Sequence, residues 1–455
     1  MKQLLILCFG LLSLNSVKAQ TVDYKVDSTA LRAIFDTVLN RGQCHQNLYE
    51  LCKDIGHRIT ASPASYKAIA WGKSKLEELD LDSVWLQPIT VPHWVRGSIE
   101  RLDFSCKTDK LYISNCTALG GSIGTEGNVL AGNIVEVRSW DELDALEPED
   151  IKGKVVFYNR PMNPSLINTF AAYGDCSQYR VYGASKAAKL GAIGIILRSV
   201  TLRIDDNPHT GIMYYEEDDI KIPGVAISAK DAYNLSNMLK SDPNTSFKMK
   251  LSCKTLPDTI SYNVIGEIKG SEKPDEIILV GGHLDSWDIG EGAHDDGAGV
   301  VQSIETMRLF NLLKIKPKRT IRCVLYMNEE NGNRGGKGYA KYAEEYNENH
   351  IFALETDRGG FSPRGFSVDA TDDQFENLQA FKSLFLPYYI HIIKKGYGGV
   401  DIGPLKKTGD VCLLGLMPDS QRYFDFHHAK SDVWENVNQR ELELGAGAIA
   451  SMVYL

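Results

Sequence analysis

Hydrophobic positions recur along the chain with a spacing that changes from region to region. In residues 29–80 apolar side chains return every three or four positions, which predicts helices, and residues 84–91 then predict a strand. From residue 116 to 257 the apolar runs are short and are separated by Gly and Asn, which is typical of a β-rich unit. Within that unit, residues 183–190 predict a short helix.

After residue 262 short apolar runs alternate with helical periodicity. The predicted strands are 277–281, 320–327 and 351–355, and the predicted helices are 300–313, 339–346 and 376–385. Such alternation favours an α/β fold in which helices cover both faces of a sheet. We therefore expect a three-layer α/β/α sandwich that carries the β-rich unit as an insertion.

The amino terminus has the pattern of a secretory signal peptide. Lys2 precedes an apolar run from Leu4 to Leu14, and Val17-Lys18-Ala19 offers small residues for cleavage. The run is too short to span a bilayer, which takes about 20 apolar residues, so we expect a secreted or periplasmic protein. The predicted division is 1–19, the signal; 20–115, the amino-terminal part of the main domain; 116–257, the inserted unit; and 258–455, the part with the candidate chemistry.

Composition and charge narrow the classes of partner. The 455 residues are 43% hydrophobic and 24% charged, which is typical of a globular protein. Lys and Arg number 50 and Asp and Glu 59, so the formal net charge is −9, without long blocks of one sign. Nucleic acids and anionic membranes need clustered cations, so we expect neither as a partner.

Eight cysteines follow the predicted signal. Cys323 and Cys412 lie in apolar runs and are expected as buried thiols. An exported protein can form disulfides, and the better candidates, whose pairing the sequence leaves open, are Cys44, Cys52, Cys106, Cys116, Cys176 and Cys253.

Residues that can bind metal follow each of the three predicted strands after residue 262. They are His283 and Asp285 after the first strand, Glu329 and Glu330 after the second, and Asp357 after the third. Neighbouring strands lie about 4.8 Å apart, so these side chains can converge at the carboxyl edge of the sheet. Two loops add Asp295-Asp296 and His427-His428.

Together these residues suggest two metal ions. A zinc ion takes about four nitrogen or oxygen ligands, and two ions can be held if Asp295 bridges them and Glu329 is left as a general base. The candidate ligands are His283, Asp295, Glu330, Asp357 and His428.

Other catalytic motifs are weak in this chain. Gly120-Gly121-Ser122-Ile123-Gly124 matches a nucleophile elbow, but no strong strand precedes it and no helical pattern follows. Gly72-Lys73-Ser74 lacks the upstream glycine of a phosphate-binding loop, and His-Glu-x-x-His does not occur.

Five segments, taken in order, resemble the motifs of the co-catalytic zinc exopeptidases, a family that includes bacterial leucyl aminopeptidase and glutamate carboxypeptidase. They are Gly282-His283-Leu284-Asp285-Ser286-Trp287-Asp288, Asp295-Asp296-Gly297-Ala298-Gly299, Asn328-Glu329-Glu330, Glu355-Thr356-Asp357, and Phe426-His427-His428 with Asp432. His57-Arg58-Ile59-Thr60 and Val91-Pro92-His93-Trp94-Val95-Arg96-Gly97 are similar to one carboxypeptidase branch of the family. The resemblance therefore covers nearly all of the chain after the signal.

The resemblance implies a division of ligands between two zinc ions. By the family pattern His283 and Asp357 bind one ion, Glu330 and His428 bind the other, and Asp295 bridges them. His428 is preferred over His427 because the family's ligand stands four residues before an Asp, here Asp432. Asp285 would hold the ring of His283, the insertion would be a protease-associated domain, and the protein would be a homodimer.

Two departures from the family pattern affect the substrate pocket. Asp432-Val433 stands where Asp-Thr is common, and residues 396–417 differ in the region that would shape the pocket. His294 has no role in the family pattern. Substrate preference is therefore open.

The expected chemistry is hydrolysis by metal-activated water, with Glu329 taking the proton and passing it to the leaving amine. The leading hypothesis is an exopeptidase of the carboxypeptidase or dipeptidase type that acts on dipeptides or short peptides. The alternatives are an aminopeptidase on the same scaffold, a catalytically inactive receptor and a zinc-dependent glutaminyl cyclase.

Overall fold

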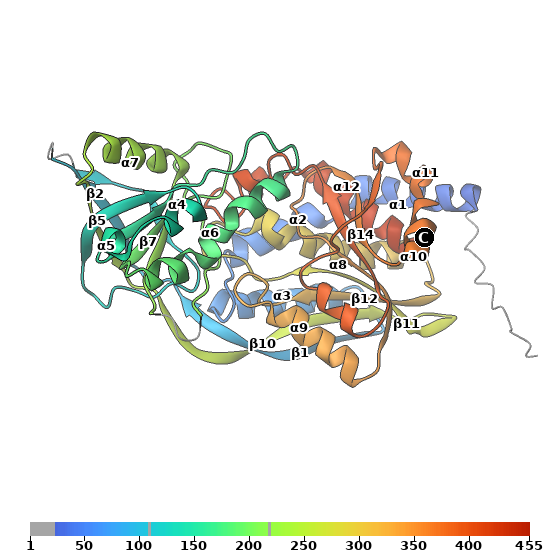
Figure 1. Cartoon of the computed structure of the whole chain (residues 1–455). Helices are drawn as coiled ribbons and strands as arrows, with labels where there is room; N and C mark the ends of the chain where they lie inside the picture. The colour runs from blue at the N-terminus through green and yellow to red at the C-terminus, as the bar shows by residue number, and fades with distance from the viewer. Residues whose placement is uncertain (1–22, 108–110, 217–219) are drawn as a thin grey trace, which may run out of the picture.

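The computed structural model describes residues 23–107, 111–216 and 220–455. The predicted signal peptide at 1–19 lies outside these residues. Two eight-stranded sheets form the framework, one at each end of an elongated molecule (Figure 1). Within the described ranges no helix is long and apolar enough to cross a membrane.

The first sheet has the strand order β1-β10-β12-β11-β13-β16-β14-β15. Its centre is parallel, since β11 pairs with β12 and β13, and β13 with β16, in the same direction. The strands are β1 (Ser83–Val95), β10 (Lys254–Ile268), β11 (Lys273–His283), β12 (Arg319–Tyr326), β13 (Asn349–Glu355), β14 (Pro363–Asp369), β15 (Ile392–Lys395) and β16 (Cys412–Pro418). The strands predicted at 277–281, 320–327 and 351–355 are confirmed as β11, β12 and β13.

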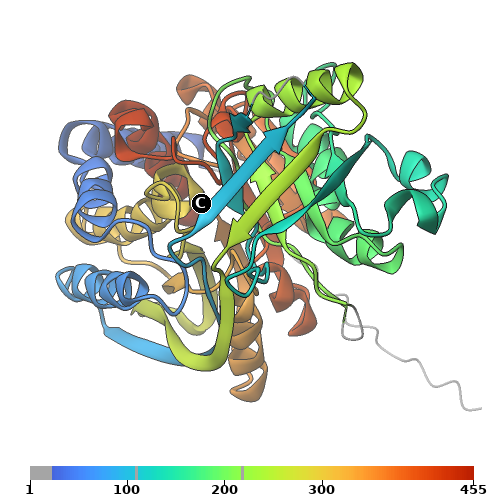
Figure 2. The same ribbon diagram turned by 90° about the vertical axis from the view of Figure 1, so that its left-hand side faces the viewer.

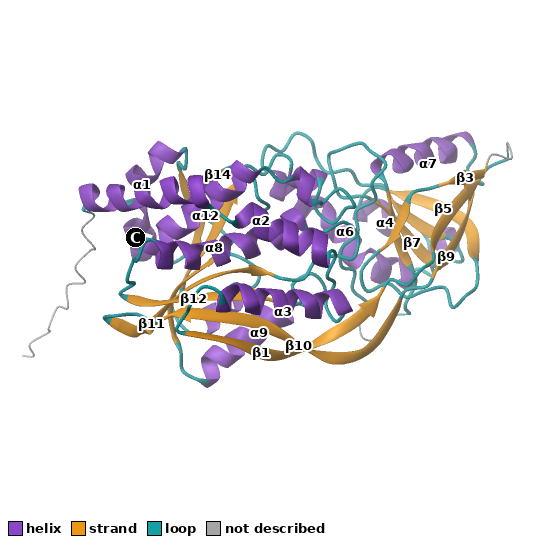
Figure 3. Ribbon diagram, turned by 180° about the vertical axis from the view of Figure 1, so that it is seen from behind, coloured by secondary structure: helices purple, strands orange, loops and turns teal. Residues whose placement is uncertain are grey.

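Helices cover both faces of this sheet (Figure 3). Alternate residues of β12 separate the two sides: Cys323 packs with α1, α3, α8 and α12, whereas Val324 packs with α9. The three-layer α/β/α prediction is confirmed. The helices are α1 (Tyr24–Arg41), α2 (Cys44–Tyr49), α3 (Pro63–Glu77), α8 (Ala298–Leu312), α9 (Arg334–Glu345), α10 (Asp372–Gln379), α11 (Lys382–Phe385) and α12 (Gln439–Tyr454).

The second sheet, which faces the viewer in Figure 2, has the order β3-β2-β9-β5-β6-β7-β8-β4. Its strands are β2 (Glu100–Ser105), β3 (Leu111–Ile113), β4 (Cys116–Ala118), β5 (Leu130–Val137), β6 (Val155–Tyr158), β7 (Gly194–Arg198), β8 (Gly224–Ile227) and β9 (Ser246–Leu251). They accompany α4 (Trp140–Asp144), α5 (Pro148–Ile151), α6 (Thr169–Lys189) and α7 (Ala229–Ser241). The chain leaves the first sheet after β1 and returns to it in β10.

Helix α6 is much longer than the predicted segment 183–190. It begins after Asn168, whose side chain accepts a hydrogen bond from the Ala171 N–H, as an N-cap does. Its first turns carry Phe170 and Tyr173, which stack on Tyr423 and Phe424 of the main domain. Tertiary packing of aromatic side chains therefore extends this helix beyond the part with clear apolar periodicity.

The predicted disulfide candidates are wrong at five positions, because Cys44, Cys52, Cys116, Cys176 and Cys253 are thiols. Their thiols contact different parts of the protein. Cys44 Sγ donates to the Val301 carbonyl at 3.7 Å, and Cys176 Sγ donates to the Arg160 carbonyl at 3.1 Å. Burial raises the pKa of the Cys116 thiol to about 12. These cysteines pack as small hydrophobic residues.

Candidate metal centre

The carboxyl ends of three parallel strands bring the candidate ligands together. His283 is the last residue of β11 and lies opposite Tyr326, the last residue of β12. Glu355 ends β13 opposite Gly281, so Asp357, two residues further on, reaches the same edge. His283 Nε2 lies 3.6 Å from Asp357 Oδ1.

Asp295 lies between two histidines. Its Oδ1 is 3.2 Å from His283 Nε2, and its Oδ2 is 3.2 Å from His428 Nε2. His428 Nε2 is also 3.1 Å from Glu330 Oε2. One carboxylate oxygen thus faces His283 and Asp357, and the other faces His428 and Glu330.

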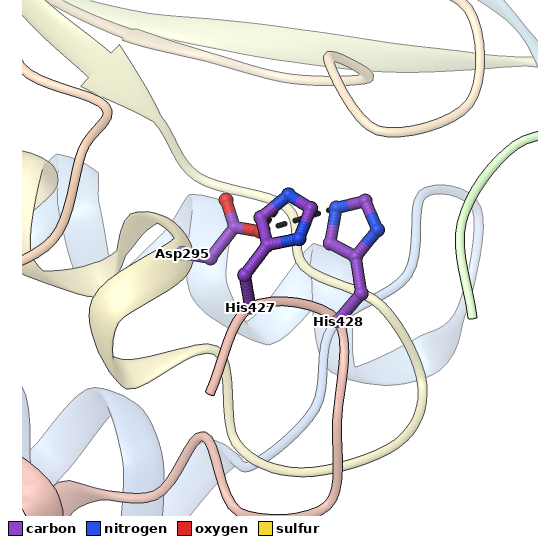
Figure 4. Close-up of side chains that lie close together, drawn as sticks. All are labelled: Asp295, His427 and His428. Atoms are coloured by element: carbon purple, nitrogen blue, oxygen red, sulfur yellow. Dashed lines mark ion pairs between the residues drawn. The ribbon is translucent and has the colours of Figure 1, made fainter. Parts of the chain in front are cut away.

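His427 lies beside His428, with its ring centroid 3.5 Å away (Figure 4). Its Nε2 is 3.6 Å from Asp295 Oδ2, compared with 3.2 Å for His428. Both histidines can form a metal-binding group with Asp295, so distance favours His428 without removing His427 as a donor.

The donor set fits metal ions because buried carboxylate oxygens have no hydrogen-bond partner. They are Asp295 Oδ2, Glu330 Oε1 and Asp357 Oδ1. A buried oxygen without a partner is costly, and divalent cations bound among these groups would satisfy all three. Carboxylate oxygens and imidazole nitrogens are also the ligands that zinc accepts at catalytic sites.

The charges of these groups depend on one another. Burial and the Asp295 carboxylate together raise the pKa of Glu330 to about 7, against the opposing effect of His428. Burial disfavours a charged His428, but Glu330 and Asp295 outweigh it and raise the pKa of that ring to about 9. The carboxylates therefore create a strong local preference for positive charge.

Glu329 lines the same cavity as Asp295 and Glu330. Burial raises the pKa of its carboxyl well above the usual range, and Asp357 adds to the rise while His283 opposes it. A carboxyl with a raised pKa is a better proton acceptor than an ordinary glutamate.

Asp285 supports the loop that carries Glu329 and Glu330. Its Oδ1 accepts the N–H groups of Asn328 at 2.8 Å and Glu329 at 3.1 Å, and its Oδ2 accepts the Glu330 N–H at 3.4 Å. The Thr60 hydroxyl donates to Oδ2 at 2.9 Å. The His283 Nδ1 is 3.0 Å from the backbone oxygen of Asp285 and 3.7 Å from its carboxylate, so the backbone makes the closer contact with the ring.

Two further polar residues shape the loop that carries Asp295. The buried Arg58 donates from Nε to the Leu284 carbonyl at 2.6 Å and from Nη2 to the Gly292 carbonyl at 2.9 Å. Asp432 accepts the N–H groups of His294 at 2.7 Å and Asp295 at 3.1 Å. The sequence contained Arg58 and Thr60 in a recognised segment, but nothing in it indicated which loops they hold.

Asp296 and His294 have other partners. Asp296 Oδ2 accepts the His283 N–H, and its Oδ1 accepts the Gly299 N–H, both at 3.0 Å. His294 Nδ1 accepts the Gly360 N–H at 3.1 Å, and burial lowers the pKa of this ring to about 4. Both residues hold backbone segments together around the candidate ligands.

Glu355 anchors one wall of the cavity, although sequence reasoning gave it no role. Its carboxylate accepts the N–H groups of Val400 at 2.8 Å and of Asp401 and Ile402 at 2.9 Å. A side chain at Gly399 would collide with it, because a Cβ there would lie 2.3 Å from Glu355 Cδ. The signal in the sequence was the Gly398-Gly399 pair, which allows this close approach.

Comparison with known proteins shows the family of the chain. The model of peptidase family M28 matches residues 263–453. Carboxypeptidase Q from Bos taurus is 34% identical over 421 residues, which cover 92% of this chain and 86% of that protein. Carboxypeptidase Q from Homo sapiens is 33% identical, with 93% and 86% covered. The chain belongs to peptidase family M28.

Within family M28 the chain is similar to carboxypeptidase Q over nearly its full length, so it is a carboxypeptidase Q-like zinc metallopeptidase of the exopeptidase type. The solved peptidase M28 precursor from Shewanella amazonensis SB2B is 33% identical with a TM-score of 0.90, covering 95% of this chain and 96% of that one. A zinc aminopeptidase from Bacillus subtilis shares the fold at 20% identity, with a TM-score of 0.64 and 90% and 94% covered. The predicted resemblance to the carboxypeptidase branch is confirmed.

Proposed function

We propose that this M28 protein is a di-zinc exopeptidase that hydrolyses dipeptides or removes terminal residues from short peptides. The observation that carries the proposal is the position of Asp295, with one carboxylate oxygen 3.2 Å from His283 and the other 3.2 Å from His428. His283 and Asp357 would hold one ion, Glu330 and His428 the other, and Asp295 would bridge them. Bound zinc supplies Lewis acidity, which lowers the pKa of water and polarises a carbonyl group.

Glu329 would act as the general base. Its carboxyl lines the cavity beside the proposed ligands and has a raised pKa. It would take a proton from the attacking water and deliver that proton to the nitrogen of the leaving amine. Asp285 would keep Glu329 and Glu330 in place through their backbone N–H groups.

Hydrolysis of a small panel of dipeptides, free or blocked at either terminus, tests this proposal with zinc added to the purified protein. Loss of cleavage only on carboxyl blocking would support carboxypeptidase or dipeptidase action. Loss only on amino blocking would support an aminopeptidase, which shares this metal centre. A protein that binds two metal ions and cleaves no member would instead be a receptor-type binding protein.

Glu329→Gln separates the base from the ligands. We expect this variant to keep its zinc and to lose about 10²- to 10⁴-fold in turnover, the usual contribution of general acid–base catalysis. Glu344→Gln is the matched control, because Glu344 is exposed on α9. Asp295→Ala should lose zinc, and an unchanged content of two ions would refute the bridging role.

The remaining predictions are also proposals. The unit between β1 and β10 is proposed as a protease-associated domain inserted in the peptidase domain, and the protein as an exported homodimer. Sedimentation of the purified protein tests the dimer, and amino-terminal sequencing of the exported form tests cleavage after residue 19.

A further inference from the structure

A groove beside the edge of the first sheet lies outside the candidate active site. It runs between β1 and α9, which lie next to each other in Figure 1, and has a volume of about 660 Å³. Residues 85–90 of β1 form one side, and α9 forms the other. Among the described residues, none that lines this β1–α9 groove also lines the cavity over the candidate ligands. The groove is therefore a separate surface of the molecule.

The outer edge of β1 is open. Strand β1 comes first in the order of the sheet, and within residues 23–107, 111–216 and 220–455 it pairs with β10 alone. Pro88 lies in the middle of β1, and a proline in an edge strand turns its nitrogen away from the neighbouring strand. Because the backbone direction alternates along a strand, the N–H groups of Leu86 and Thr90 should face the same open edge. Such an edge is a template on which another extended chain can pair.

The floor of the groove is held by contacts between α9 and the sheet. Gly338 allows α9 to approach β1 closely, because a Cβ there would lie 2.8 Å from Ile89 Cγ2. Gln87 Nε2 donates to the Gly338 carbonyl at 3.1 Å, and Gln87 Oε1 accepts from Asn263 Nδ2 at 2.9 Å. The two sides of the groove are thus fixed before a ligand binds, which reduces the entropy lost on binding.

The α9 side of the groove is positively charged. Arg334, Lys337 and Lys341 are exposed and line the groove. Among the described residues Arg334 and Lys337 form no ion pair, and Lys341 Nζ lies 3.6 Å from the carboxylate of Glu345, which also lines the groove. The chain as a whole has a formal net charge of −9. The groove therefore carries an excess of positive charge on an acidic protein, which favours an acidic ligand.

The spacing of these cations suits an extended chain. Lys337 and Lys341 are about one helical turn apart, which is about 6 Å along the helix axis. Alternate residues of a strand lie about 6.7 Å apart on one face. Acidic side chains at every second position of an added strand would therefore meet successive cations of α9 while the backbone pairs with β1. Tyr342 and Tyr346, whose ring centroids are 4.5 Å apart, offer apolar contact further along the groove.

We propose that the β1–α9 groove binds an extended segment of a partner protein, which carries acidic side chains at alternate positions and pairs with the outer edge of β1. The segment is distinct from a peptide substrate, because the groove and the cavity over the candidate ligands have separate linings. The inference does not depend on the proposed function, since it needs neither metal nor turnover.

The probe is a short fluorescent peptide, blocked at both ends, in which Glu alternates with Val. Fluorescence anisotropy follows its binding to the metal-free protein, next to a matched peptide in which Lys replaces each Glu. We expect the acidic peptide to bind at least about 10-fold more tightly than the basic one, because its charges complement those of α9. Methylation of alternate backbone nitrogens of the acidic peptide should abolish binding, because it removes the donors that pair with β1.

A double variant tests the charged side of the groove. Lys337→Glu with Lys341→Glu should weaken binding of the acidic peptide about 10- to 30-fold, since two attractions become repulsions. Lys67→Glu with Lys240→Glu is the matched control, because these lysines are exposed on α3 and α7 and the change in net charge is the same. A general effect of net charge would weaken binding equally in both double variants, whereas a specific groove would weaken it only in the first.

Amide hydrogen exchange locates the bound peptide. We expect exchange to slow in residues 84–90 of β1 and to stay unchanged in residues 397–400, which line the cavity. Slower exchange in residues 397–400 alone, or competitive inhibition of dipeptide hydrolysis, would overturn the proposal, because the peptide would then occupy the cavity. Absence of binding, equal affinity for the acidic and basic peptides, and equal losses in the two double variants would each overturn it as well.

Discussion

The number of hydrogen bonds that Asp285 accepts predicts how much unfolding free energy is lost when this residue is replaced. Its carboxylate is fully buried and accepts three backbone N–H groups, from Asn328, Glu329 and Glu330, and the Thr60 hydroxyl. In Asp285→Ala the three N–H groups lose their acceptor. A buried donor without a partner costs about 1–3 kcal/mol, so this variant should lose roughly 3–9 kcal/mol of unfolding free energy.

Asp285→Asn should cost less. Its amide oxygen can still accept from Asn328 and Glu329, and its NH₂ group can donate to the Thr60 oxygen, so the change weakens two charge-assisted bonds and leaves the Glu330 N–H without its acceptor. The difference between charged and neutral hydrogen bonds is about 1 kcal/mol each and a buried N–H without a partner costs about 1–3 kcal/mol, which gives a loss of roughly 3–5 kcal/mol. Thr60→Val removes only one of the hydrogen bonds to the Asp285 carboxylate and serves as the control.

Urea unfolding of the metal-free proteins measures these losses, and turnover with added zinc reports the position of Glu329. Asp285→Ala should unfold at a lower urea concentration than Asp285→Asn, and any folded fraction should turn over slowly. Equal midpoints for the parent and Asp285→Ala would refute the reasoning. A large loss of turnover in Asp285→Asn with normal stability would instead favour a direct role of this carboxylate at His283.

Three further results are expected. Burial, with a contribution from Arg322, lowers the pKa of His350 to about 3 in the folded protein. The ring titrates near 6.5 in the unfolded chain, so below pH 6.5 the unfolded chain binds a proton that the folded protein does not. The contribution of His350 to stability is therefore full above pH 6.5 and declines as the pH falls towards 3. When the pH is lowered from 7 to 5, the free energy of unfolding of metal-free His350→Gln should therefore fall by about 2 kcal/mol less than that of the parent, as measured by urea unfolding. Equal falls in the two proteins would contradict this prediction. Ser122→Ala should keep its turnover, because Ser122 Oγ is occupied by the Gly224 N–H and the Ile123 carbonyl, each at 2.9 Å; a folded but inactive variant would revive a serine nucleophile. Gly120→Ala should destabilise the fold by about 1–3 kcal/mol and shift the tryptophan fluorescence, because its Cβ would lie 1.8 Å from Trp287, and an unchanged melting temperature would contradict this packing.

The sequence predicted the central strands and the ligand candidates because both depend on local order. A parallel strand buried on both faces is a continuous apolar run, and the residue that follows it must lie at the carboxyl edge of the sheet. His283, Glu330 and Asp357 were found in this way. His428 needed the family resemblance, since nothing in its local pattern separates it from His427.

The supporting residues could not be predicted in the same way, because their contacts are distant in the sequence. Arg58 contacts the carbonyls of Leu284 and Gly292, more than 200 positions away. The carboxylate of Glu355 was hidden at the end of an apolar strand, and its three N–H donors come from residues 400–402. Helix α6 was underestimated because its aromatic residues pack against a different unit.

The segment that carries His427 and His428 also has a consequence for the order of assembly during folding. The Thr210 N–H donates a hydrogen bond to the His428 carbonyl at 2.9 Å, and the His427 carbonyl lies 2.7 Å from His209 Nδ1. His209 and Ala429 also form an isolated antiparallel β-bridge. These contacts join positions about 220 apart, and such contacts form late because long loops must close first. Metal uptake by this chain should therefore report the last stage of folding, when both units have met.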